Sequence, residues 1–147
     1  MYTGLLHTHS GLRYVVLLLL VIVVAKSLVG LLNNKPFERG DEKLTLWLMI
    51  ATHIQLLVGL VLYFVSPLVK FGADTMKDSV TRYWTVEHSF IMLIAVVLIT
   101  LVRTSTKKLP GDKAKHKRVF ILSVSALVLI VLAIVMSGRG ILIPVRA

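Results

Sequence analysis

The sequence predicts an all-α integral membrane protein that folds as a four-helix bundle running up-down-up-down. Four long apolar runs fill most of the 147 residues, at about 5–32, 44–65, 84–102 and 119–136. Hydrophobic residues make up 56% of the chain and its mean hydropathy is +0.85, above the range of soluble domains. Each run approaches or exceeds the roughly 20 apolar residues that span a bilayer. We expect one transmembrane domain over residues 1–147, with no separate soluble domain.

The positive charge lies mainly in the segments between the runs. The first and third connections together carry ten Lys and Arg residues, against five in the second connection and the C-terminal tail. The positive-inside rule therefore predicts a multi-pass membrane protein with both termini outside, and we expect it in the bacterial inner (cytoplasmic) membrane. Because this orientation explains the net charge of +10, we expect the lipid bilayer and no nucleic acid as a partner.

The first two runs have clear end signals. We expect the first helix to begin near Leu5 and to be retained, because the chain lacks the cationic start and cleavage site of a signal peptide. Pro36 cannot continue that helix, and the segment 36–43 is expected to be an ordinary cytoplasmic loop. The second helix is expected from Leu44 until Ser66 and Pro67 end it.

The last two runs are bounded in the same way. An outer connection over 68–83 begins with apolar residues, and Tyr83 and Trp84 mark the entry of the third helix at the interface. A turn at 109–112 separates the third and fourth helices. The segment 137–140 ends the fourth helix, and the tail 141–147 is expected at the outer surface.

Histidines inside or beside the apolar runs are the candidate functional residues. Ionisable side chains at membrane depth are costly and often functional. His9 and His88 each lie about four residues, or about 6 Å, inside the outer ends of the first and third helices. These helices are diagonal in an up-down bundle, so the two imidazoles could ligate one b-type haem from opposite sides.

Neighbouring residues are suited to a haem. Arg13, four residues after His9, could pair with a propionate, and Gly11 would allow a flat ring near the backbone. Trp84 and Met92, one turn on either side of His88, could form apolar walls. Since the chain has no cysteine, one haem b would be bound non-covalently.

The other histidines leave alternatives open. His53 lies mid-span and could replace His9 as the ligand, or hydrogen-bond to a quinone headgroup or another helix. His116 lies in the lysine-rich loop and is expected to be solvated. His7, His9, Glu87 and His88 could instead form an outer-face copper or zinc site. A further alternative is a non-catalytic accessory or assembly subunit of a larger membrane complex, with structural histidines.

Three short segments resemble small four-span bacterial membrane proteins described as cytochrome b-like. They are Thr8–Arg13, Thr52–Gly59 and Glu87–Ser89, and the resemblance covers nearly the whole chain in length and layout. It implies haem contacts at His9, His88 and His53, and electron exchange with quinol or a membrane or periplasmic partner. The chain has no nucleophile–base pair or acid pair, so we expect an electron carrier or subunit of a respiratory chain, not an enzyme by itself.

Overall fold

The computed structural model describes residues 1–138, and the predicted tail 141–147 lies outside them. Four long helical segments make up the protein, without a β-strand among the described residues. They are α1 (Tyr2–Leu32), α2 (Arg39–Val65), a third segment over Ser79–Thr106 and α5 (Asp112–Met136). The third segment comprises α3 (Ser79–Arg82), the π-helical turn η1 (Tyr83–Glu87) and α4 (His88–Thr106). All four segments are long and apolar enough to cross a membrane, which confirms the predicted fold class.

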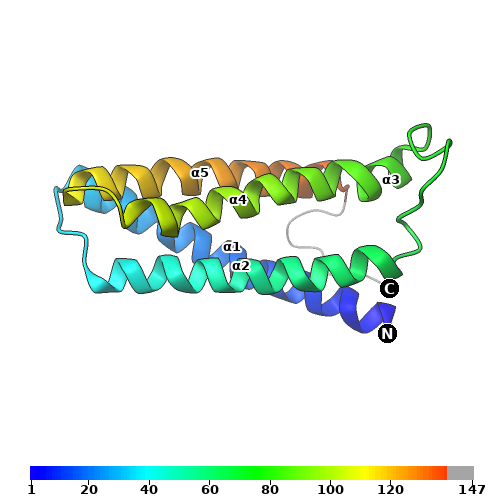
Figure 1. Ribbon diagram of the computed structural model, residues 1–147, viewed down its shortest axis with the longest axis horizontal. Coiled ribbons are helices and arrows are strands. Elements are labelled where there is room, and N and C mark those ends of the chain that lie inside the picture. Colours follow the sequence, from blue (N-terminus) through cyan, green and yellow to red (C-terminus); the bar gives the residue numbers. More distant parts are fainter. Residues whose placement is uncertain (139–147) are drawn as a thin grey trace.

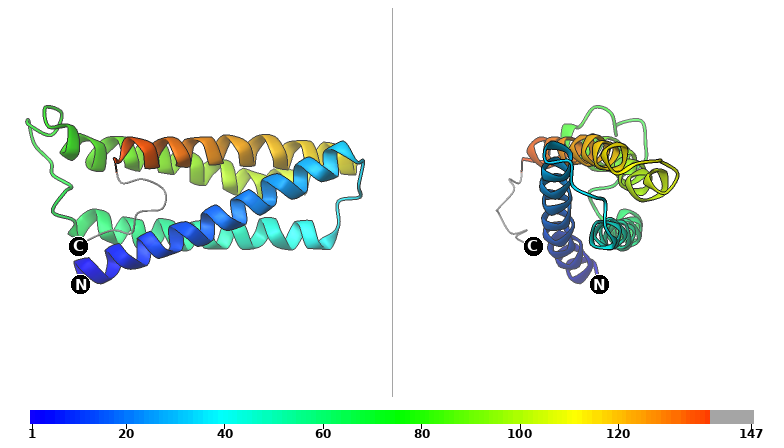
Figure 2. Two further views of the ribbon diagram at one scale, coloured as in Figure 1. Left: turned by 180° about the vertical axis from the view of Figure 1, so that it is seen from behind. Right: turned by 90° about the vertical axis from the view of Figure 1, so that its left-hand side faces the viewer.

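The helices run up-down-up-down around a ring (Figures 1 and 2). Helix α1 packs against α2 and α5, and α4 packs against the same two helices. Helices α1 and α4 are therefore diagonal, as the sequence predicted. We call the end at which α1 begins and α5 ends the terminal end. The opposite end, with the connections at 33–38 and 107–111, is the basic end.

Every helix extends beyond its apolar run. Helix α2 begins at Arg39 because Glu38 and Asp41 form a capping box, in which the Glu38 N–H donates to Asp41 Oδ2 at 3.0 Å. The prediction of a loop over 36–43 was therefore wrong for residues 39–43, which belong to α2. The third segment begins at Ser79, where Asp78 accepts a hydrogen bond from Thr81 N–H at 2.8 Å. Hydropathy marks only the apolar part of a helix, whereas caps decide where it begins.

Helix α5 shows the largest difference from the prediction. It begins at Asp112, seven residues before the apolar run, after Gly111 has turned the chain with a φ of 84°. The early start carries His116 onto a packed helix, where only 2% of its surface is exposed. The expectation that His116 is a solvated loop residue was wrong.

The core lies along the bundle axis on the basic-end side of the histidines. Leu20, Leu48 and Ile99 are fully buried there, one from each of three helices. Leu20 is eleven residues beyond His9, or about 16 Å along α1. Large apolar side chains such as Leu18, Leu57 and Val128 remain exposed on the outside of the bundle, the pattern of a lipid-facing surface.

Candidate functional site

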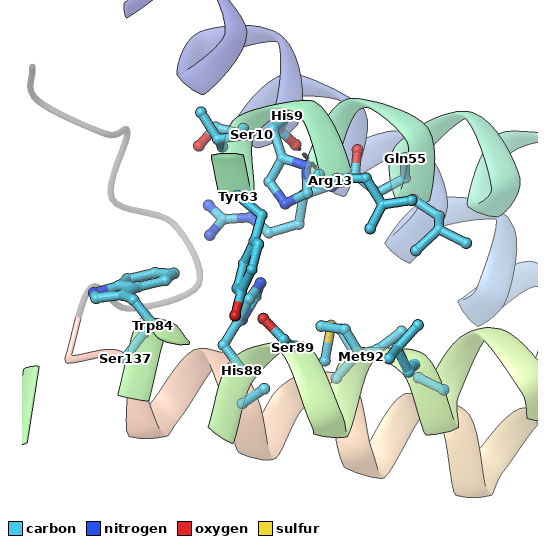
Figure 3. Close-up of a pocket in the computed structure, with 18 of the residues that line it drawn as sticks. His9, Ser10, Arg13, Gln55, Tyr63, Trp84, His88, Ser89, Met92 and Ser137 are labelled. Atoms are coloured by element: carbon cyan, nitrogen blue, oxygen red, sulfur yellow. Dashed lines mark hydrogen bonds between the residues drawn. The ribbon is translucent and has the colours of Figure 1, made fainter. Parts of the chain in front are cut away.

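A cavity of about 390 Å³ lies inside the terminal-end half of the bundle. This volume falls in the usual range for small-molecule and cofactor sites. All four helical segments line the cavity, mainly with apolar side chains (Figure 3). The polar lining includes His9, Ser10, Arg13, Thr52, Gln55, Tyr63, His88 and Ser89.

The rings of His9 and His88 face each other across this cavity. Their centroids are 6.4 Å apart and their planes are inclined at 71° (Figure 3). Two imidazoles that ligate one metal ion from opposite sides have centroids about 6 Å apart, from two metal–nitrogen bonds of about 2 Å and two ring radii of about 1 Å. The two rings therefore meet across the diagonal of the bundle, and their spacing matches a shared ion.

Helix α2 fixes the position of His9. The Gln55 side chain donates from Nε2 to the His9 carbonyl oxygen at 2.9 Å. A Cβ atom on Gly59 would lie 3.0 Å from His9 Cε1, so the glycine gives the ring its room. His9 Nδ1 is buried and has no hydrogen-bond partner among residues 1–138. A buried ring nitrogen without a partner costs about 1–3 kcal/mol, and such atoms often mark a site for a ligand.

The π-helical turn η1 positions His88. It ends at Glu87, immediately before His88, and single π turns of this kind occur often at functional sites. The Tyr83 hydroxyl donates to the Ala133 carbonyl on α5, and the Tyr63 hydroxyl donates to the Thr85 carbonyl at 2.9 Å. These two bonds tie the turn to both neighbouring helices, so the ring of His88 projects from a fixed backbone.

Aromatic and thioether side chains surround His88, as the sequence predicted. The Trp84 ring lies 5.2 Å from the His88 ring between centroids, and the Tyr83 ring lies 5.8 Å away. Met92 lines the cavity one turn further along α4. Together they give the imidazole a largely apolar wall.

Arg13 brings a positive charge into the cavity. Its Nη2 donates to the Tyr14 hydroxyl at 3.0 Å, whereas its buried Nε has no partner among the described residues. Gln55 Oε1 is likewise buried without a partner in residues 1–138. The cavity therefore offers a cationic donor and a neutral acceptor that an anionic or hydroxylated ligand could use.

Two predicted contacts do not reach the cavity. Gly11 is exposed, because two residues along a helix turn it about 200° away from His9. His53 is half-buried on the flank of α2, and its Nδ1 is 2.7 Å from the Met49 carbonyl on the same helix. Neither residue lines the cavity, so we do not assign them contacts there.

Sequence reasoning missed the α2 wall of the site. Thr52, Gln55 and Gly59 all line the cavity from one face of that helix. Their spacing of three and four residues forms a small polar stripe in an otherwise apolar span, which is a signal that could have been found. Leu68 and Val69, at the apolar start of the second connection, also line the cavity, and this fold-back was not predicted.

The alternative copper or zinc site has no ligand cluster. Within residues 1–138, no group of three or more His, Asp or Glu side chains is placed to hold a metal ion. Glu87, one of the candidate ligands, instead forms an ion pair with Arg82, whose Nε lies 2.7 Å from Glu87 Oε1. We therefore do not propose that site.

Neither a family model, a curated protein nor a solved structure matches this chain. The function is therefore inferred from the cavity and the side chains that line it.

Proposed function

We propose that this protein is a b-type haem protein of the bacterial inner membrane that carries single electrons between the quinone pool and a membrane or periplasmic partner. The observation that supports this most is the 6.4 Å separation of the His9 and His88 rings across one cavity within the bundle. The resemblance to small cytochrome b-like proteins agrees with the same assignment. When bound, a haem b supplies one-electron oxidation and reduction at its iron.

His9 and His88 would hold the haem through their ring nitrogens. Two histidine ligands would favour electron transfer over oxygen binding. Arg13 would pair with a propionate, because its side chain bends back toward the N-terminal end of α1, where His9 lies. Trp84 and Met92 would cover the faces with apolar surface, and the buried Leu20, Leu48 and Ile99 exclude water from the basic-end side.

The proposed orientation follows from charge. Lys and Arg are concentrated at the basic end, which we place in the cytoplasm, so the haem site lies near the outer surface. Because the chain has no cysteine, single cysteines can be labelled one at a time. Lys108→Cys should react with an impermeant thiol reagent only after the cell membrane is opened, whereas Asp74→Cys should react in spheroplasts.

Absorption spectroscopy of the purified protein tests the haem assignment. The protein made in haem-sufficient cells should give sharp low-spin bands when reduced, and His9→Ala and His88→Ala should each lose the low-spin spectrum. His53→Ala is the matched control and should keep it, since His53 does not line the cavity. Colourless wild-type protein would overturn the proposal and favour an accessory subunit. Equal loss in the control would overturn the assignment of the ligands.

A further inference from the structure

The cavity reaches the outside of the bundle at one flank. Among the described residues that line it, only Leu60 and Leu93 are exposed, by 45% and 49%. A residue that both lines a cavity and is exposed marks a place where the cavity meets the surroundings. Both side chains are apolar and both lie within helices that can span a membrane, so those surroundings are the acyl chains of the bilayer.

The two leucines belong to neighbouring helices, α2 and α4. Leu60 lies three residues before Tyr63, whose hydroxyl bonds to Thr85, so it lies on the ridge of α2 that faces the third helical segment. The α2–α4 side is also the least closely packed of the four sides of the bundle. The opening therefore lies between α2 and α4.

The described residues cover the cavity at both ends of the bundle. At the terminal end, Leu68 and Val69 fold over it, and the Lys70 N–H holds that segment by donating to Thr85 Oγ1 at 3.1 Å. At the basic end, the fully buried Leu20 and Leu48 fill the space between the helices. A molecule that enters between α2 and α4 would come from the lipid, not from water.

We propose that the flank between Leu60 and Leu93 is a lateral portal through which a lipid-soluble quinol reaches the cavity from within the bilayer. The portal is apolar, which suits a molecule dissolved in lipid. Inside, Gln55 Oε1 is a buried acceptor without a partner in residues 1–138, and a quinol hydroxyl can donate to it. The redox role of the quinol rests on the proposed function, whereas the route depends only on the geometry of the cavity.

Tryptophan fluorescence in haem-free protein tests the route. Trp84 lines the cavity, and the second tryptophan, the exposed Trp47, is removed by Trp47→Phe. The variant is placed in lipid nanodiscs and titrated with a decyl-tailed benzoquinone, which partitions into the bilayer. A sulfonated benzoquinone, which stays in water, is the matched quencher. The tailed quinone should quench Trp84 saturably and several-fold more strongly than the sulfonated one.

Substitutions at the portal decide whether the quinone passes between the leucines. Leu60→Phe/Leu93→Phe should weaken the quenching several-fold, and Leu60→Ala/Leu93→Ala should strengthen it. The control is Leu57→Phe/Leu101→Phe, at exposed residues of the same helices that do not line the cavity, and its quenching should be unchanged. Equal quenching in all three double variants, or equal quenching by the sulfonated quinone, would overturn the portal. Because haem is absent, these outcomes do not depend on the haem assignment.

Discussion

The imidazoles of His9 and His88 meet across the bundle with centroids 6.4 Å apart, although their helices are diagonal and do not pack closely against each other. Side-chain length alone does not bring the two rings together. Gly59 makes room for one ring, and the π turn over Tyr83–Glu87 sets the position of the other. The pair therefore depends on residues that are not themselves candidate ligands.

Gly59→Ala should weaken haem binding several-fold. Its new Cβ would lie 3.0 Å from His9 Cε1, so the ring must move by a few tenths of an ångström. Titration of haem-free protein with haem measures the change in Kd. Gly11→Ala is the matched control, because it makes the same substitution on a helix with nothing within 4 Å of the new Cβ. If both variants bound haem like the wild type, Gly59 would not position His9.

Gly30→Ala should destabilise the basic end. A Cβ at this position would lie 2.6 Å from both ring nitrogens of His116, which is packed 5.1 Å from the Phe37 ring between centroids. Overpacking of this kind costs about 1–3 kcal/mol, measurable by reversible unfolding in detergent. Gly4→Ala, with nothing within 4 Å, should be neutral. In Gly30→Ala/His116→Ser a smaller side chain replaces the imidazole, so part of the lost stability should be recovered. No recovery would mean that the overpacking does not involve His116.

Tyr63→Phe should loosen the connection between α2 and α3. It removes the hydroxyl that donates to the Thr85 carbonyl at 2.9 Å, a bond worth about 0.5–1.5 kcal/mol. Amide hydrogen exchange should accelerate over 66–78, the segment that folds back over the cavity. Tyr14→Phe removes a hydroxyl that, within residues 1–138, is bonded to Arg13 of the same helix, and it should leave that exchange unchanged. Unchanged exchange in Tyr63→Phe would show that the connection is held by other contacts.

The start of α3 should depend on pH through Asp78. Hydrogen bonds from the Thr81 side chain and backbone N–H hold the pKa of the Asp78 carboxyl below its ordinary value of 3.8. A lowered folded-state pKa means that the cap stabilises α3 above pH 3.8 and loses this effect as the pH falls through the folded-state pKa. The protection of the Thr81 amide, measured as its intrinsic exchange rate divided by its observed rate at the same pH, should therefore fall in acid, and Asp78→Asn should remove most of that pH dependence. A midpoint at or above 3.8 would contradict the cap.

The sequence by itself determined the membrane-spanning bundle, the diagonal placement of α1 and α4, and the pairing of His9 with His88. Hydropathy and helix rise are properties of the local sequence. Short connections make successive helices antiparallel neighbours, which places the first and third helices on a diagonal of the bundle. Trp84, Met92 and Arg13 followed from the same periodicity, since residues three or four apart share a helix face.

Only the tertiary structure decided which faces turn inward. It excluded Gly11 and His53 from the cavity and brought Gln55 and Gly59 to its wall, because the rotation of α2 about its axis is set by packing against α1. It buried His116, because α5 begins directly after the turn at Gly111, inside a charged segment that hydropathy alone would assign to a loop. It also brought Leu60 and Leu93 to the cavity as exposed residues of two neighbouring helices, since an opening depends on how closely two helices pack.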